Sequence, residues 1–387
     1  MKLIEVSTQE EAEEFVHFAV RLYRQDRFWI RPLDQDIEWV FDKQKNKTFG
    51  HGYCTRWLLK RDGETIGRIA AFINGKTAHK SNDQPTGGIG FFECIEDQQV
   101  ANLLFDTAKE WLEDLGMEAM DGPINFGDRD KWWGLLVDGF HLEPNYQCNY
   151  HKPYYRFLFE NYGFEIYFKQ FTFIREIADP VHIRIEEKAE KVRALGEYQF
   201  RHIRRYRLSH YAEEFRIVYN KAWSGHDGVA EMSKDEALAI MKQLKPVLDE
   251  KLIWFAYYQN EPVAFFVGLP EVNQIFKYMD GELNLIGKIK FLLHRLLSTN
   301  KKVLGLVFGV VPEHQGKGLD GALIWEVAKF LQKKYQKYET IEMNWIGDFN
   351  RKMLLVLKQV GGDIGKTHHT YRYLFDRSRP FSRLPIK

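Results

Sequence analysis

The sequence has few of the features that mark secreted, disulfide-linked or membrane-spanning proteins. Only three cysteines occur among 387 residues, Cys54, Cys94 and Cys148, and their spacing matches no zinc or redox motif. An odd number of widely separated thiols is typical of a reducing compartment. No run of about 18 apolar residues is present, so no membrane-spanning helix is expected. Because the first residues also lack the cationic start and apolar stretch of a signal peptide, we expect a cytoplasmic protein.

An excess of charge of one sign is also missing. The 55 Lys and Arg residues balance 54 Asp and Glu residues, which leaves a formal net charge of +1. No overall field therefore favours nucleic acid, and we expect no nucleic-acid partner. The strongest basic run, 201–207, is followed by Glu213 and Glu214 and is more typical of a solvated strand and loop. The pair His368-His369 has no cysteine neighbours, so no metal site is expected.

Large apolar side chains, by contrast, are abundant. Hydrophobic residues make up 44% of the chain and aromatic residues 15%. Such a composition is sufficient for packed cores, or for the walls of an apolar ligand tunnel. With roughly 150 residues to a domain, the length indicates two or three domains.

In the first half of the chain, the pattern predicts strands and helices in a defined order. A strand at 2–6 precedes a helix opened by a capping box at 7–10. A hairpin turns at Asp62-Gly63, and a long amphipathic helix begins after its cap, Asp97. A short helix and a strand close this half near residue 174.

The second half repeats that order. Ser233 opens a helix with a second capping box, and a hairpin turns at 259–261. An apolar strand at 303–311 leads into an amphipathic helix at 319–335, and another strand, a helix and a last strand follow. One segment, 271–300, has no counterpart in the first half.

A repeat of this length indicates duplicated domains. We therefore predict an α/β (mixed α+β) fold with an N-terminal domain at 1–176, a charged linker at 177–194 and a C-terminal domain at 195–387 that carries the insertion 271–300. The oligomeric state is not indicated by the sequence.

The segment 310–322 has the pattern of an anion site. An apolar strand runs into a turn with Gly316, Gly318 and Gly321, which opens directly onto a helix. Such a turn directs backbone N–H groups and the positive end of a helix dipole at one point, and Lys317 and His314 add positive or donor character. A pyrophosphate fits this geometry. A turn without a ligand and a dinucleotide loop, with Glu339 as the ribose acid, remain alternatives.

This segment resembles the acyl-CoA loop of the GNAT acyltransferases, [QR]-x-x-G-x-[GA], with Gln315 in the first place and Gly318 in the fourth. The sixth place holds Asp320 instead of glycine or alanine. That carboxylate would repel phosphates unless it points away or pairs with Lys317.

Other segments carry the same resemblance. The stretch 350–353, with Gly361-Gly362 at the end of the helix, is similar to the second GNAT motif, in which a tyrosine often protonates the leaving thiolate. Leu357 stands at that position here, and Tyr371 or Tyr373 could replace it. In the first half, the turn at 92–98 has no glycine and three acids, which argues against a pyrophosphate there. The stretches 121–125 and 134–140 resemble a bacterial group of uncharacterised tandem GNAT-like proteins.

The resemblance implies acyl transfer from acetyl-CoA or another acyl-CoA to a small-molecule amine, with acetyl transfer as the expected reaction. Backbone N–H groups of Val310 or Val311 would hold the thioester oxyanion. The candidate general bases are Glu342 and His226, and the candidate acid is Tyr371. The residues expected to bind the cofactor are Val310, Val311, Gln315, Gly316, Lys317, Gly318, Leu319, Asp320, Gly321 and Asn350.

Three alternatives remain open. The protein could be a binding module that keeps the fold without turnover, because Asp320 and Leu357 depart from the family pattern. It could also resemble the tandem GNAT enzymes that use aminoacyl-tRNA, although the near-neutral charge argues against this. The insertion 271–300 could contain an amphipathic helix that packs on its own domain or touches lipid.

Overall fold

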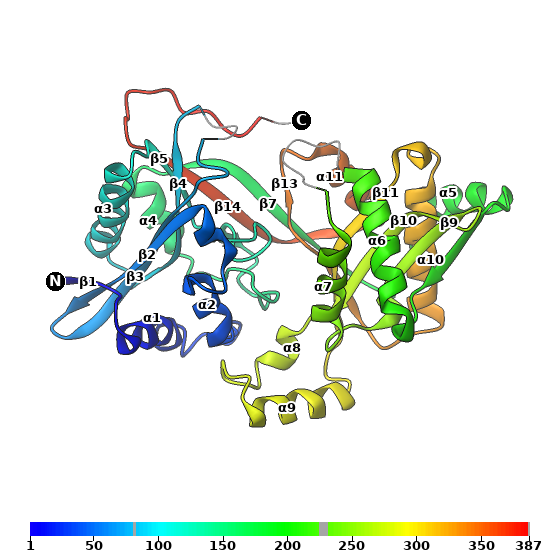
Figure 1. Ribbon diagram of the computed structural model, residues 1–387, viewed down its shortest axis with the longest axis horizontal. Coiled ribbons are helices and arrows are strands. Elements are labelled where there is room, and N and C mark those ends of the chain that lie inside the picture. Colours follow the sequence, from blue (N-terminus) through cyan, green and yellow to red (C-terminus); the bar gives the residue numbers. More distant parts are fainter. Residues whose placement is uncertain (80–82, 224–230, 386–387) are drawn as a thin grey trace.

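The computed structural model of the chain describes residues 1–79, 83–223 and 231–385. Its described strands form one continuous mixed sheet that runs through the whole molecule, with the order β1-β2-β3-β4-β5-β14-β7-β12-β11-β10-β9-β8. The predicted α/β class with a mixed sheet is confirmed. Figure 1 shows the sheet passing from the N-terminal half into the C-terminal half, with helices packed around both.

Strands of the N-terminal half are β1 (Lys2–Glu5), β2 (Gly52–Arg61), β3 (Glu64–Asn74), β4 (Thr86–Cys94), β5 (Ala119–Gly122), β6 (Leu135–Asp138) and β7 (Glu165–Glu176). Strands of the C-terminal half are β8 (Tyr198–His202), β9 (Ile253–Tyr258), β10 (Glu261–Pro270), β11 (Lys302–Val310), β12 (Thr340–Met343), β13 (Ile346–Gly347) and β14 (Asp363–Leu374). The helices are α1 (Gln9–Leu22), α2 (Asp34–Phe41), α3 (Gln98–Asp114), α4 (Tyr155–Tyr162), α5 (Ile183–Ala194), α6 (Leu208–Trp223), α7 (Lys234–Leu244), α8 (Asn273–Phe276), α9 (Leu285–Leu296), α10 (Leu319–Lys333) and α11 (Arg351–Val360).

The last strand of each half completes the sheet of the other half. β7 and β14 pair antiparallel along most of their lengths. β14 also pairs with β5, with Tyr371 opposite Gly122, and β7 also pairs with β12, with Arg175 opposite Ile341. In Figure 1 the red strand β14 leaves the C-terminal half and enters the sheet of the N-terminal half. Main-chain hydrogen bonds therefore join the two halves in both directions, a link that the sequence pattern did not predict.

The helix starts follow the local sequence. Ser233 caps α7 in the predicted capping box with Glu236, and the Asp97 carboxylate caps α3. The first capping box is shifted by one residue from its predicted place, because Thr8 and not Ser7 is the N-cap and Glu11 is its partner. The segment 177–194 contains α5, which buries Ile185, Ala189 and Val192 and packs along α10.

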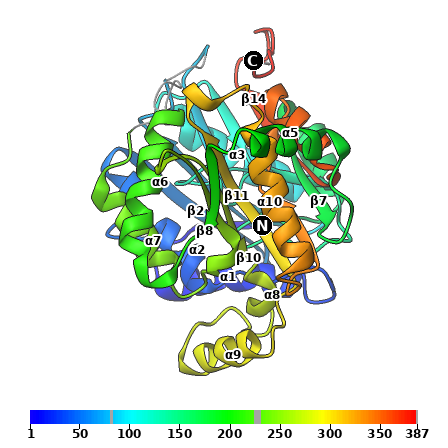
Figure 2. The same cartoon turned by 90° about the vertical axis from the view of Figure 1, so that its right-hand side faces the viewer.

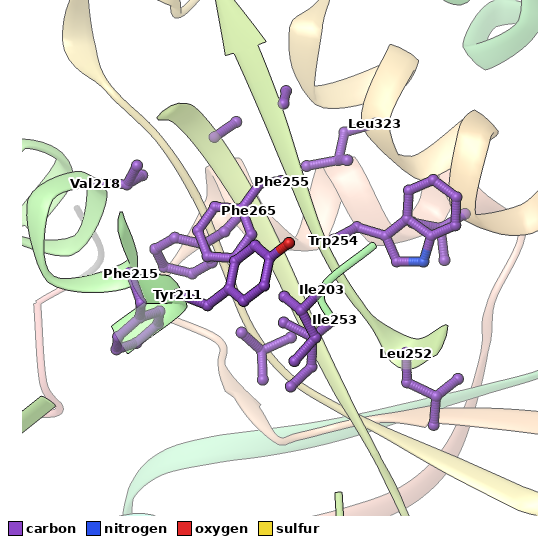
Figure 3. Close-up of a cluster of buried hydrophobic side chains, with 14 of the residues drawn as sticks. Ile203, Tyr211, Phe215, Val218, Leu252, Ile253, Trp254, Phe255, Phe265 and Leu323 are labelled. Carbon is purple, nitrogen blue, oxygen red and sulfur yellow. The ribbon is translucent and has the colours of Figure 1, made fainter. Parts of the chain in front are cut away.

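Each half has its own hydrophobic core. In the N-terminal half, α3 and α4 cover the sheet with side chains such as Leu104, Phe105 and Phe159. In the C-terminal half, Phe215 of α6 contacts Phe265 of β10, with ring centroids 4.7 Å apart. Figure 3 shows this cluster. The halves are joined by strand pairing and by a smaller shared cluster, in which Ile275 and Phe276 of α8 pack with Leu33 of the N-terminal half.

Candidate functional site

The glycine turn lies between β11 and α10, as predicted. β11 ends at Val310, a short 3-10 turn (Pro312–His314) follows, and α10 begins at Leu319. Gly316 and Gly318 have positive φ angles of 73° and 82°, which only glycine adopts without strain. Gly318 is the N-cap of α10, and no side chain caps the helix.

The N–H groups of this turn have no partner in the part of the chain that the structure describes. No hydrogen bond is donated there by the amides from Gly316 to Gly321, and the first one of the helix runs from Ala322 N to Gly318 O (3.0 Å). Gly316 and Lys317 are exposed to solvent. A helix N-terminus with open amides favours an anion, and an added Cβ at Gly316 would meet no atom within 4 Å. The turn therefore fits a phosphate group.

Gly321 is required for a different reason, the packing of α10 against α5. A Cβ on Gly321 would lie 2.8 Å from Cδ of Lys188, which belongs to α5. Gly321 therefore permits the close approach of α5 to α10. The three-glycine pattern combines two backbone turns with one packing contact.

Asp320 pairs with a lysine of α5. Its carboxylate pairs with Lys188, with Nζ and Oδ2 3.3 Å apart, and not with Lys317. The same ammonium group also donates to Oε1 of Gln359 at 3.4 Å. Both partners are partly exposed, so the pair adds little stability, at most about 1 kcal/mol. The ammonium group of Lys188 does partly offset the negative charge of Asp320. It thereby reduces the repulsion between this carboxylate and a phosphate bound at the turn.

Residues just before the turn form hydrogen bonds with neighbouring residues of the C-terminal half. Gln315 donates from Nε2 to Val310 O at 2.9 Å. Val311 N already donates to Val263 O at 3.0 Å, so that amide cannot also serve an oxyanion. His314 shares a hydrogen bond of 2.8 Å with the Tyr198 hydroxyl, and burial together with Lys317 lowers the pKa of His314. His314 is therefore neutral near pH 7, and Lys317 remains as the cation of the turn.

A cleft opens where β11 and β12 separate, and α10, which begins at the turn, forms one of its walls. The two strands pair in parallel from Lys302 to Gly305, and Asn344 N donates to Gly305 O at 2.8 Å. Beyond this bond, β13 pairs with β7 instead. The gap opens into a cavity of about 450 Å³ between β11, β12, α10 and α11.

The walls of this cavity are mainly apolar. Leu306, Phe308, Ile324, Met343, Trp345 and Leu357 are among its lining residues. Leu306 lies at a bulge of β11 and has no partner on β10. Leu357, at the position where the resemblance to the second GNAT motif leads to the expectation of a tyrosine, contributes an apolar wall here. Asn350 also lines the cavity and caps α11 through Met353 N at 3.1 Å.

Neither Tyr371 nor Glu342 lines the cleft. Tyr371 lies in the core of the N-terminal half, where its hydroxyl donates to Oε1 of Glu160 at 3.0 Å. Burial and this carboxylate raise the pKa of Tyr371. His226 lies outside the described residues. The catalytic roles of Tyr371 and His226 stay predictions.

Glu342 is fully buried and bound by two lysines. Lys302 Nζ lies 2.8 Å from Oε2, and Lys366 binds Oε1. Burial acts to raise the pKa of Glu342, but the two ammonium groups outweigh it and hold the pKa below its usual value. Its neighbours Ile341 and Met343 line the cavity, so by strand alternation Glu342 points to the opposite face of the sheet. A carboxylate held in this way is a weak base, and its predicted role lacks support from the geometry.

Arg129 was not predicted to belong to the site. It comes from the N-terminal half, yet it lines the cavity of the C-terminal half. Its guanidinium carbon lies 5.3 Å from the ring centre of Phe168 and 5.9 Å from that of Trp345. Within the described ranges no carboxylate pairs with it. This contact depends on how the two halves pack together, so the sequence pattern could not reveal it.

The fold, the open glycine turn and the cleft between separating strands define a tandem GNAT architecture. No family model matches the chain. It is similar to a tandem GNAT protein from the clavulanic acid biosynthesis pathway, with a TM-score of 0.54 and 9% identity over 98% of this chain and 99% of that chain. This likeness confirms the predicted fold.

Two relatives are similar to nearly the whole chain in sequence. Protein YghO of Escherichia coli K12 is 26% identical over 92% of this chain and 91% of its own length. A bacterial ceramide synthase of Caulobacter vibrioides is 26% identical over 96% of this chain and 97% of its own length. No described helix is long and apolar enough to cross a membrane.

Proposed function

We propose that the protein is an acyl-CoA-dependent N-acyltransferase that works in the cleft of its C-terminal half. The observation that carries this proposal is the row of unpartnered amides from Gly316 to Gly321, at the N-terminus of α10, the helix that also lines the cavity between β11 and β12. The amides and Lys317 would hold the pyrophosphate of the co-substrate, and the strand edges would receive its arm. The bound thioester supplies an activated acyl carbon.

We propose further that the acyl group is longer than acetyl. The cavity of about 450 Å³ falls within the roughly 300–1,000 Å³ of ordinary ligand pockets, and its walls are mostly apolar. Each methylene buried there would add about 0.8 kcal/mol of binding free energy. The name of one relative, a bacterial ceramide synthase, agrees with a long acyl group and a sphingoid amine as acceptor.

This chain's residues supply positioning and desolvation. The apolar walls exclude water from the thioester, and Arg129 stands at the cavity as a cation that forms no ion pair in the described ranges, with Asp121 as its acidic neighbour. We propose that Arg129 attracts a polar or anionic group of a substrate. The attacking amine must lose a proton. Glu342 is a poor acceptor because two lysines bind its carboxylate, so the proton passes to the solvent or to another base.

A charge reversal at the turn tests the binding site. Lys317→Glu should weaken CoA binding about tenfold in isothermal titration, because it places a carboxylate beside the phosphates. Lys333→Glu makes the same change at the other end of α10 and should leave the affinity unaltered. Equal affinities of the two variants would refute the proposed phosphate site.

Thiol release from acyl-CoA tests the reaction and the acyl length. Acetyl-CoA, octanoyl-CoA and palmitoyl-CoA are compared with a small amine and with a sphingoid base. We expect amine-dependent release that is fastest with the longest acyl group and the sphingoid base. Preference for acetyl-CoA and the small amine would refute the lipid assignment while keeping the transferase.

A second candidate function is a binding module without turnover. Leu357 at the place of the acid and the clamped Glu342 favour it. Binding of CoA without release of thiol for any amine in the panel would support this alternative.

A further inference from the structure

Helix α9 projects from the body of the molecule and presents apolar side chains to solvent. In Figures 1 and 2 it lies apart from the sheet, at the lower end of both views. Leu296 is 81% exposed and Leu285 is 74% exposed. The other exposed apolar residues of this segment are Ile286, Ile289, Leu292, Leu293 and Leu297. A soluble protein rarely exposes so many neighbouring apolar side chains without a binding role.

The exposed residues form one stripe along the helix. Leu285, Ile289, Leu292 and Leu296 follow one another at intervals of four, three and four residues, which places them on one face. The opposite face packs on the protein. His294 stacks on Tyr278 with ring centroids 4.1 Å apart, and Phe291 contacts Phe276 at 5.9 Å. The apolar face of α9 is therefore directed away from the core, in contrast to an ordinary surface helix.

Cations outnumber acids along α9, although Asp280 and Glu282 precede it and Lys301 pairs with Glu339. Lys288, Lys290 and Arg295 lie on α9, and Lys301 follows it. No Asp or Glu occurs between Leu283 and Lys302, although the chain as a whole is nearly neutral. The cations are held near the helix, since Lys290 donates to Tyr278 O at 3.2 Å and Arg295 bonds Pro246 O.

We propose that α9 binds the surface of an anionic lipid bilayer. The apolar stripe would enter the boundary between headgroups and acyl chains, and the cations would lie at the level of the phosphates. Charge complementarity favours a bilayer over a second copy of the chain, because a second copy would bring the same cations face to face. This inference stands apart from the proposed reaction, since a protein without turnover would bind the surface equally.

Sedimentation of the full chain with vesicles tests the proposal. One set of vesicles is phosphatidylcholine alone, and the other contains phosphatidylcholine and phosphatidylglycerol in equal parts. We expect the protein to pellet with the anionic vesicles and to be released by high salt. The variant with Leu285, Ile289, Leu292 and Leu296 all changed to Gln should bind at least about tenfold more weakly. Lys288→Gln should weaken binding about fivefold, and only to the anionic vesicles.

A control variant separates the stripe from exposed apolar surface in general. Phe157 and Leu195 are 62% and 60% exposed and lie outside α9, so Phe157→Gln with Leu195→Gln should bind vesicles as the wild type does. Thermal melting checks that each variant is folded. Absence of the wild type from both pellets, or equal binding by the stripe variant, would overturn the proposal. A wild-type dimer in light scattering that becomes a monomer in the stripe variant would overturn it too, by showing a contact between copies.

Discussion

The two halves share one order of elements but differ at the turn between the fourth strand and the next helix. In the N-terminal half, the Asp97 carboxylate caps α3 and accepts hydrogen bonds from Gln99 N (2.9 Å) and Val100 N (3.4 Å). In the C-terminal half, Gly318 caps α10 without a side chain. The N-terminal amides of α3 are therefore bound by a carboxylate of the protein itself. Those of α10 stay free to bind an anionic ligand.

The halves also differ where their central strands separate. In the N-terminal half the chain after β5 stays on β4, and Ile124 N donates to Ile89 O at 2.7 Å. A Cβ on Gly90 would lie 2.0 Å from Ile124 O, so glycine allows this closure. In the C-terminal half the strands part after Gly305 and leave the cavity. Gly90 thus allows two chain segments to approach closely in the N-terminal half, whereas Gly316 and Gly318 form a turn with free amides in the C-terminal half.

The N-terminal half is needed for the fold even though it has no open turn. β7 and β14 each complete the sheet of the other half, so neither sheet is whole alone. We infer that the N-terminal half supplies structure and the wall residue Arg129, while the C-terminal half supplies the anion turn.

The largest expected effect comes from the buried ion cluster of Glu342, Lys302 and Lys366 in the C-terminal half. Lys366→Met removes one partner of Glu342, which is fully buried, and should lower the free energy of unfolding by about 3–5 kcal/mol. Lys188→Met removes a partly exposed partner of Asp320 and should cost no more than about 1 kcal/mol. Urea unfolding measures both.

A replacement of the whole cluster provides the control. Changing Lys302 and Lys366 to Met together with Glu342→Leu leaves no unpaired charge and should recover most of the stability. A Lys366→Met protein as stable as the wild type would contradict the account.

The next effect is a pH dependence carried by Glu271, which is buried near the contact of the halves. Burial raises the pKa of Glu271 to about 7, above its value near 4.5 in an unfolded chain. The folded state thus binds this proton more tightly, and the stabilisation present at low pH is lost as pH rises through 7. Between about pH 5 and pH 8, the free energy of unfolding should fall by roughly 2–3 kcal/mol more in the wild type than in Glu271→Gln. Thermal melts across this range measure it.

Glutamine can still accept the bonds that Tyr146 N and Asn273 N donate to Glu271, so the variant tests the charge and not the contacts. Glu93→Gln offers the comparison in the N-terminal half, because burial raises the pKa of Glu93 as well. Parallel pH profiles of wild type and Glu271→Gln would show that Glu271 does not titrate in this range.

Filling the cleft should make the C-terminal half resemble the closed N-terminal half. Val307→Trp places a large ring in the cavity and should lower kcat/KM for a long-chain acyl-CoA about a hundredfold, or about 2.7 kcal/mol. CoA without an acyl chain should bind nearly as before, because the glycine turn is unchanged. Full activity of a folded Val307→Trp protein would rule out this cavity as the acyl site.

The smallest expected effect concerns the helix cap. Gly318→Asp imitates Asp97 by placing a carboxylate at the N-cap of α10, and it should weaken CoA binding about tenfold, or 1.4 kcal/mol. Gly318→Asn shares the shape and the positive φ without the charge, so it isolates the electrostatic part. Titration calorimetry compares the two, and equal affinities would argue against an anion at these amides.

The sequence predicted the parts of the fold that depend on local patterns. The hairpin at Asp62-Gly63, the caps at Asp97 and Ser233 and the glycine turn all follow from neighbouring residues, and the structure places them there. Strand exchange could not be predicted, because the alternation of β14 is the same whichever sheet it joins.

The site was predictable only in part for the same reason. The turn at Gly316 and Gly318 is contiguous in sequence, so its geometry could be inferred. The partners of Asp320 and Glu342 come from α5, β11 and β14, and Arg129 comes from the other half. Contacts of this kind depend on tertiary packing, which periodicity does not encode.

Electron density for CoA in a soaked crystal tests the central claim most directly. The account predicts one CoA per chain, with its pyrophosphate within hydrogen-bond distance of the amides of Gly316–Leu319 and its arm between β11 and β12. Pyrophosphate density at the turn before α3 instead, or no density at either turn despite saturating CoA, would contradict it.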